Sequence, residues 1–161
     1  MSNTGRSDCP INLTAELLGD RWSLLVLRDI MFADRRSYRV MLQKSEEGIA
    51  SNILASRLKH LVAGGLLTTT EDPAHKQRVH YSLTEPAIEL LPTMIQIGAW
   101  GARFLPADDI RGPWFSYIYE LGPAVWKQIA DDLRHRHLGA TQPGPDSATV
   151  ASLAKDYKRK L

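Results

Sequence analysis

The stretch that decides the fold is residues 51–84, SNILASRLKHLVAGGLLTTTEDPAHKQRVHYSLT. Three leucines in its first part recur at i, i+4 and i+7, which places them on one face of a helix. The pair Gly64-Gly65 supplies a stop for that helix. Beyond it, two segments of strand-forming residues flank a proline-containing turn. The stretch therefore predicts a helix over residues 51–63, followed by a β-hairpin.

The two predicted strands span residues 66–71 and 78–83, with the turn over residues 72–77 between them. Apolar and polar residues alternate along the second strand, so one face of the hairpin is expected to be buried and the other to be basic or polar. Lys76 lies at the expected tip. We expect a protruding hairpin with positive charge at its end.

The predicted helix 51–63 has a narrow polar face opposite its leucines, formed by Asn52, Ser56 and Lys59. Such a face can approach base edges in the major groove, which is only about 12 Å wide. A solvent-exposed polar face of an ordinary amphipathic helix is the alternative interpretation. The hairpin that follows favours DNA recognition.

Three shorter signals precede this helix. Cys9-Pro10 opens a first helix, Asp20 caps a second over residues 21–32, and Ser37 caps a short third one. Gly48 marks the turn before the helix at 51–63. Three helices, a hairpin and a further helix make a mainly α fold with a small β-hairpin, which is the order of a winged helix-turn-helix.

The helix expected over residues 86–105 carries two neighbouring apolar stripes. One packing partner would leave one stripe exposed, so we expect this helix to supply much of a homodimer interface. Residues 106–161 are expected to form a C-terminal helical extension of unknown role. We therefore expect a DNA-binding and dimerisation domain over residues 1–105 and an extension over 106–161.

Composition fits this organisation. The 161 residues, 43% of them hydrophobic and 24% charged, suit one globular domain with an extension. Residues 35–80 hold eight basic and four acidic side chains, an excess of +4, whereas the other two thirds of the chain have none. No apolar run is long enough for a membrane span, the N-terminus is polar, and Cys9 has no second cysteine to pair with. We expect a cytoplasmic protein.

The residues also resemble the HxlR-type winged-helix regulators, over roughly residues 9–101. The matching motifs are Cys9-Pro10, Gly19-Asp20-Arg21-Trp22-Ser23-Leu24-Leu25, Gly48-Ile49, Leu54, Ser56-Arg57-Leu58, Leu61, Arg78-Val79-His80-Tyr81-Ser82-Leu83-Thr84, Leu91-Pro92 and Trp100-Gly101. Two departures stand out. Ala50-Ser51 occupies the place of a common Ser-Pro pair, and the extension from Pro106 has no counterpart in the shortest members.

The resemblance implies a sequence-specific transcriptional regulator, more simply a repressor than an activator, which acts as a homodimer on a pseudo-palindromic operator in double-stranded DNA. By resemblance and position, the DNA-binding residues would be Ser51, Asn52, Ser56 and Lys59 on the recognition helix, Arg36 and Ser37 at the preceding helix, and Lys76 and Arg78 on the wing. Arg57, which lies to the side of the polar face, is expected to form an internal ion pair.

Cys9 is a candidate redox sensor, because a helix N-terminus favours the thiolate and some relatives are implied to sense oxidants in this way; an inert thiol is the alternative. Spacing assembles no catalytic or metal site, and we expect no cofactor. The rival to a DNA-binding regulator is a winged-helix module that senses a ligand or binds a protein, with the aromatic-rich extension lining a site for an effector of unknown chemistry. An enzyme ranks third.

Overall fold

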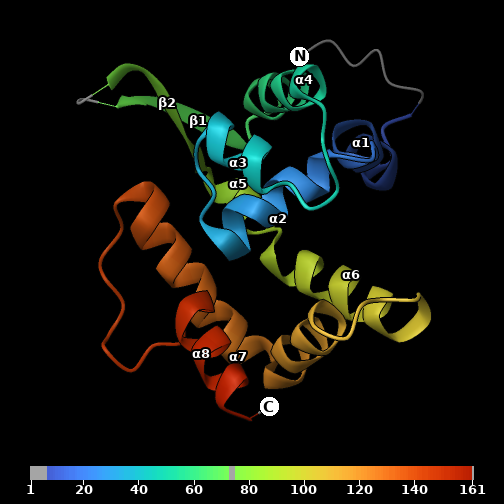
Figure 1. The fold of residues 1–161 in the computed structure, drawn as a ribbon, viewed down its shortest axis with the longest axis vertical. Helices are drawn as coiled ribbons and strands as arrows, with labels where there is room; N and C mark the ends of the chain where they lie inside the picture. Colours follow the sequence, from blue (N-terminus) through green and yellow to red (C-terminus); the bar gives the residue numbers. More distant parts are fainter. Residues whose placement is uncertain (1–6, 73–74, 161) are drawn as a thin grey trace. The chain divides into compact units, whose positions relative to one another are not determined.

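The computed structural model describes residues 7–72 and 75–160, and the side chains of residues 7–71 and 79–159. The chain divides into two compact units, Met1–Ser82 and Leu83–Leu161. The first unit contains α1 (Pro10–Leu18), α2 (Ser23–Ala33), α3 (Tyr38–Lys44), α4 (Ser51–Ala63), β1 (Leu67–Asp72) and nearly all of β2 (His75–Leu83) (Figure 1). The second contains α5 (Glu85–Ile88), α6 (Leu91–Phe104), α7 (Arg111–Leu138) and α8 (Val150–Lys160). The functional division that we expect at residue 105 is a different kind of boundary from these compact units, and it stays a prediction.

The core of the first unit lies between α2 and α4. Leu27 and Ile30 of α2 are completely buried, and the leucine stripe of α4 is confirmed: Leu54, Leu58 and Leu61 are at most 1% exposed. Each fully buried leucine stabilises the fold by about 1.5–3 kcal/mol relative to an exposed one. The leucine stripe therefore fixes which face of α4 is turned to solvent.

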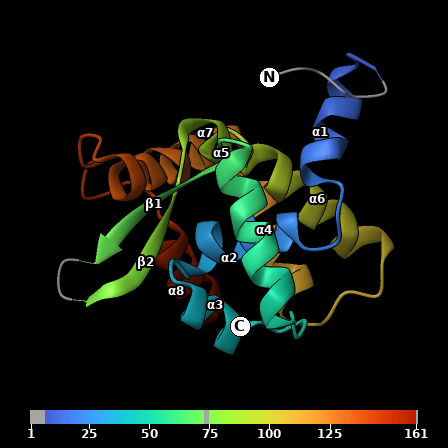
Figure 2. The same ribbon diagram turned by 90° about the horizontal axis from the view of Figure 1, so that it is seen from above.

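The hairpin is a two-stranded antiparallel sheet of β1 and β2, and it extends away from the helices of its unit (Figures 1 and 2). The predicted hairpin is confirmed, but the turn predicted over residues 72–77 is too long, since β1 continues to Asp72 and β2 already begins at His75. Pairing with β1 outweighs the weak strand propensity of residues 75–77. An isolated antiparallel bridge between Ser37 and His80 joins the start of α3 to β2.

In the second unit, the prediction of one continuous helix over residues 86–105 is wrong. The structure has α5, a break at residues 89–90, and then α6, with Pro92 in the first turn of α6. Proline lacks a backbone N–H donor and clashes with the preceding turn, so the first turn of a helix tolerates it best. The proline therefore begins a helix here rather than bending one.

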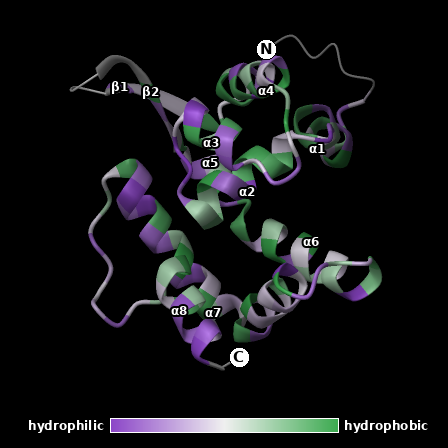
Figure 3. Ribbon diagram, viewed as in Figure 1, coloured by the Kyte–Doolittle hydropathy of each residue, from purple (hydrophilic) through white to green (hydrophobic). Residues whose placement is uncertain are grey.

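Both apolar stripes expected on this helix are buried towards the N-terminus of α6, where Met94 is only 7% exposed, and are exposed towards its C-terminus, so the structure does not divide them into one buried and one exposed stripe. Leu91 and Ile95 are completely buried, and Gly98 lets the ring of Phe115 on α7 approach so closely that a Cβ atom would lie 2.3 Å from it. Most of α6 is pale or green in Figure 3, so its residues are of intermediate or hydrophobic character. A row of large apolar side chains towards the C-terminal end of the helix stays exposed, and we call it the exposed stripe. Its members and their exposed fractions are Ile97 47%, Trp100 57%, Phe104 59% and Leu105 55%.

Helix α7 consists of two helical segments that meet at Gly122, whose φ of 78° only glycine adopts readily. Its aromatic first half packs against α8: the rings of Trp114, Tyr117 and Tyr157 lie 5.2–6.0 Å apart, centroid to centroid. Rings at these separations are in packing contact. The aromatic side chains of the extension therefore pack α7 against α8.

Candidate nucleic-acid interface

The exposed side of α4 gathers four of the predicted site residues. Ser51, Asn52, Ser56 and Lys59 are all solvent-exposed, and the last three follow one another at helical spacing opposite the buried leucines. These side chains are short or flexible and can donate hydrogen bonds. The structure therefore brings them together on one polar surface, which we call the α4 face.

The N-terminus of α4 adds donors to the α4 face. The N-cap residue Ala50 has no side chain that could accept a hydrogen bond from the first turn. Without a capping oxygen, the positive end of the helix dipole and its first amide groups are directed to solvent, where an anion such as a phosphate is favoured. The sequence departure at Ala50-Ser51 does not move the helix start, which lies at Ser51 as expected.

An ion pair to the segment before α2 helps to hold α4 in its place. Nη1 of Arg57 lies 3.3 Å from Oδ2 of Asp20, which confirms the expected internal ion pair. Burial opposes ionisation of Asp20, but hydrogen bonds from Ser23, from the Trp22 amide and from Arg57 outweigh it and lower the pKa of this carboxyl. Asp20 accepts from the Trp22 and Ser23 amides at 2.8 and 3.0 Å, so it caps α2 as predicted although α2 begins two residues later.

Sequence reasoning missed two further contacts of α4. The hydroxyl of Tyr38 donates to the carbonyl of Ser51 at 3.0 Å, and Nε2 of His60 lies 2.8 Å from the carbonyl of Leu17. A hydroxyl that reaches a backbone carbonyl thirteen residues away leaves no sequence pattern.

Arg36 and Ser37 belong to the segment before α3 and make their side-chain contacts with β2 and with α3. Nε of Arg36 donates to the Tyr81 carbonyl at 3.2 Å, and Nη2 donates to the hydroxyl of Ser82, which is buried. The Ser37 hydroxyl accepts from the Val40 amide and caps α3, as expected. Both residues fasten the start of α3 to strand β2, and their contact with DNA stays a prediction.

Lys76 and Arg78 belong to β2, but their side chains lie outside the part of the chain whose side chains are described. The strand itself reaches both positions. Their contact with DNA also stays a prediction.

Cys9 is the N-cap residue of α1 and is exposed. Hydrogen bonds from the backbone amides of Asn12 and Ile11 lower the pKa of its thiol. A thiol with a lowered pKa provides more thiolate, the reactive form, at neutral pH.

Other kinds of site find little support in the described residues. They contain no group of three or more His, Cys, Asp or Glu side chains arranged to hold a metal ion. Among the same residues, no helix is long and apolar enough to cross a membrane.

Known proteins share this arrangement. The model of the HxlR-like helix-turn-helix family matches residues 17–109. An uncharacterized HTH-type transcriptional regulator of Mycobacterium tuberculosis is 35% identical over 94 residues, which cover 58% of this chain and 58% of that protein. The match thus spans less than two thirds of the relative.

Two solved structures are similar to nearly two thirds of this chain. PA1607, solved as a candidate transcription factor, has a TM-score of 0.58 and 30% identity and covers 65% of this chain and 70% of its own. The reduced form of the transcriptional regulator YodB from Bacillus subtilis has a TM-score of 0.50 and 27% identity and covers 63% of this chain and 100% of its own. The fold is a winged helix-turn-helix with a C-terminal helical extension, and the chain belongs to the HxlR-like helix-turn-helix family of DNA-binding transcriptional regulators.

Proposed function

We propose that this chain is a homodimeric, sequence-specific repressor that reads a pseudo-palindromic operator with the α4 face. One observation carries the proposal: α4 turns a row of small and polar side chains to solvent while three leucines on its other side hold it rigidly in the core. The major groove admits a rigid helix whose exposed side chains are short and polar. A repressor needs no further machinery, because occupying a promoter excludes polymerase.

In this proposal, the residues of the α4 face divide between bases and backbone. Asn52, Ser56 and Lys59 lie along the middle of the face and contact base edges, while Ser51 and the uncapped first turn bind a phosphate. Lys76 and Arg78 bring the wing to the adjacent minor groove or backbone. Ser37 stays a candidate phosphate contact, whereas the bonds of Arg36 to β2 support a role in holding the wing.

The exposed stripe of α6 supports the homodimer. Large apolar side chains that are half exposed on one helix face make a surface suited to a second copy of the same face. Two copies related by a twofold axis present two recognition helices, so the operator half-sites should lie about one helical turn, roughly 10 bp, or a multiple of it apart.

The test of DNA recognition is to select bound fragments from a random duplex pool and then to measure Kd at several salt concentrations. Asn52→Ala should weaken binding to the selected fragment by about 1–3 kcal/mol and relax the preference at one base position. Lys59→Ala should weaken binding and lower the salt slope by about 1 if it meets a phosphate.

The matched control is Lys127→Ala, which removes an exposed lysine of α7. It should leave both affinity and salt slope unchanged. If wild type enriches no sequence, the proposal fails. An Asn52→Ala protein with unaltered affinity and sequence preference would remove that residue from the interface.

We further propose that Cys9 makes the regulator responsive to oxidants. A hydroperoxide would oxidise the thiolate to a sulfenic acid and would itself be reduced to an alcohol or water. Because the chain has no second cysteine, a thiol from another molecule must then displace water to form a mixed disulfide. A negative or bulky group would thereby be attached to the first turn of α1.

The test compares operator affinity before and after a hydroperoxide treatment in the presence of a small thiol, for wild type and Cys9→Ser. Wild type should change affinity and Cys9→Ser should not. Alkylation of Cys9 in wild type should reach its half-maximal rate at a lower pH than an ordinary cysteine, because its pKa is lowered. Equal responses of the two proteins to the oxidant would exclude this switch.

A further inference from the structure

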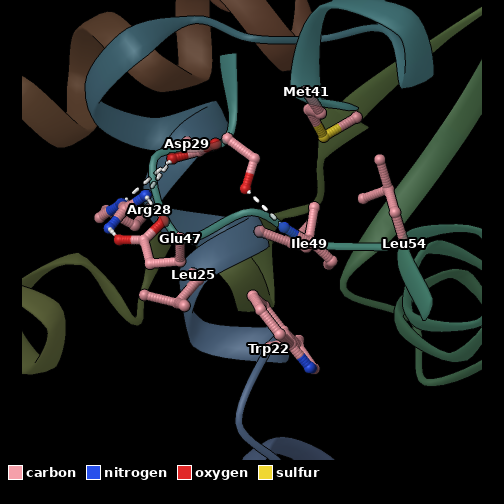
Figure 4. Close-up of a pocket in the computed structure, with 10 residues that line it drawn as sticks. Trp22, Leu25, Arg28, Asp29, Met41, Glu47, Ile49 and Leu54 are labelled. Atoms are coloured by element: carbon pink, nitrogen blue, oxygen red, sulfur yellow. Dashed lines mark hydrogen bonds and ion pairs between the residues drawn. The ribbon is translucent and has the colours of Figure 1, made fainter. Parts of the chain in front are cut away.

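The turn that joins α3 to α4 is held against α2 by a bidentate ion pair. Nη1 and Nη2 of Arg28 donate to the two carboxylate oxygens of Glu47 at 2.5 and 3.0 Å (Figure 4). Arg28 belongs to α2, and Glu47 lies in the middle of the turn. Two parallel hydrogen bonds fix orientation as well as distance, because the guanidinium is planar.

A second arginine completes this arrangement through Asp29, which is only 7% exposed. Oδ1 of Asp29 accepts from Arg28 at 2.7 Å, and Oδ2 accepts from Nη1 of Arg35 at 3.1 Å. Arg35 also donates to the carbonyl of Lys44, the last residue of α3, at 2.8 Å. We call Arg28, Asp29, Arg35 and Glu47 the turn clamp.

The space beneath the turn is too small to be an effector site. The cavity there has a volume of about 10 Å³, which is room for a single water molecule. Its walls include the apolar side chains of Trp22, Met41, Ile49 and Leu54. Three residues of the turn clamp, Arg28, Asp29 and Glu47, also line it (Figure 4). The turn therefore lies closely on α2, and Trp22 is part of the packing.

The turn clamp acts at the point where small displacements matter for the α4 face. Only three residues separate Glu47 from Ser51, the first residue of α4. Within the turn, the Ile49 amide donates to the Ser45 hydroxyl at 3.1 Å, and Gly48 adopts a φ of +68°. The leucines bury one side of α4 in the core, and the turn is the segment through which the chain enters the first turn of this helix.

We propose that Arg28 and Glu47 are positioning residues that set the specificity of α4 for base sequence without touching DNA. This inference rests on the proposed function, because it requires α4 to read bases. A purely structural pair would contribute stability alone. The two roles differ in one quantity, the ratio of affinity for the selected fragment to affinity for unrelated DNA of the same length.

The experiment uses the full chain and the fragment that wild type selects from a random pool. Arg28→Lys keeps the charge but cannot form two parallel hydrogen bonds, and Glu47→Gln keeps the shape but removes the charge. The matched control is Arg136→Lys, because Arg136 makes a comparably part-buried ion pair with Asp132 within α7. For each protein we would measure both affinities, the salt slope and Tm.

Both turn-clamp variants should lower the specificity ratio about tenfold, the loss expected when one good base contact is misplaced, with the salt slope unchanged. Arg136→Lys should leave the ratio unchanged even if its Tm falls equally. Hydrogen exchange of the Ile49 amide in the free protein should become faster in the variants. If Arg28→Lys does not fold, Glu47→Gln carries the same test.

The outcomes separate the two proposals. If wild type selects a fragment and the turn-clamp variants keep the wild-type ratio while losing only stability, this inference is overturned and the proposed function stands. If wild type selects no fragment, the proposed function fails and the inference fails with it.

Discussion

Helices α4 and α6 each bury one side and expose the other, but their exposed sides differ in chemistry. The α4 face carries polar and small side chains such as Asn52 and Ser56. The exposed stripe of α6 carries Ile97, Trp100 and Phe104, which are 47–59% exposed. One chain thus presents two helical surfaces that water solvates very differently.

The difference indicates two kinds of partner. Burial of apolar surface contributes about 25 cal/mol per Å², so the stripe of α6 gains free energy from almost any complementary apolar surface, and in the proposed homodimer a second copy supplies that surface. The α4 face gains little from burial alone and is stabilised only where hydrogen bonds replace those with water. Base edges and phosphates provide such bonds.

The largest effect should come from charge on the α6 stripe. Trp100→Asp or Phe104→Asp places a carboxylate where the proposed interface is dry, so the dimer should dissociate to monomers. Because two linked half-sites bind more tightly than one by roughly 10²–10⁴-fold, operator affinity should fall by at least about 100-fold. Sedimentation gives the oligomeric state, and fluorescence anisotropy gives the Kd.

Leu138→Asp is the control, because it alters a large apolar residue of α7 that is also exposed, at 45%. It should change neither measurement. If the Trp100 and Phe104 variants remained dimeric, the stripe would not be part of the dimer interface, and dimerisation would not explain its exposure.

A smaller effect is expected on the covered side of α6. A methyl group at Gly98 would collide with the Phe115 ring, so Gly98→Ala should lower stability by about 1–3 kcal/mol through overpacking. Gly101→Ala is the matched control, because its Cβ would meet nothing closer than a Leu105 methyl at 4.0 Å. In a helix that control should be neutral or stabilising by up to about 1 kcal/mol.

Urea unfolding measures both stabilities, and sedimentation shows whether either variant still dimerises. We expect dimers in both cases, since the covered side and the exposed stripe of α6 serve separate contacts. If the Gly98→Ala and Gly101→Ala proteins were equally stable, the Phe115 ring of α7 would be able to move aside at little energetic cost.

The α4 face was predictable because its signal is periodic. Leucines at i, i+4 and i+7 fix the buried side, and the polar side follows by geometry. The break before α6 was harder, since Pro92 permits either a bent helix or a new one and only tertiary packing decides. The aromatic first half of α7 also carried no clear helical signal, because its rings pack on both α7 and α8.

Charged contacts were the least predictable part of the site. The expected pairing of Arg57 followed from its position beside a known face, but Arg28 and Glu47 are nineteen residues apart with no pattern connecting them. Arg36 shows the same difficulty. A basic residue before a helix suggests a phosphate contact, and only the fold shows that its guanidinium reaches Tyr81 and Ser82.

The smallest effect concerns the ion pair between Asp20 and Arg57 of α4, and it depends on pH. Asp20 has a pKa lowered from its ordinary value of 3.8, so its charged form stabilises the folded state. The contribution is fully present above the ordinary pKa and is lost as pH falls through the lower folded-state pKa. Asp20→Asn keeps an acceptor for the α2 amides but cannot form an ion pair with Arg57, so at pH 7 it should cost about 0.2–1 kcal/mol.

Thermal unfolding from pH 7 to pH 3 would measure this difference, which should shrink below about pH 4 as wild type loses its own charge. The exposed Asp146→Asn serves as control and should follow wild type throughout. A stability difference that stayed constant with pH would assign the effect to hydrogen-bond geometry rather than to charge. Since the leucines of α4 and its contacts through Tyr38 and His60 remain, operator affinity at pH 7 should change less than about threefold, whereas a large loss would place Arg57 among the residues that orient the α4 face.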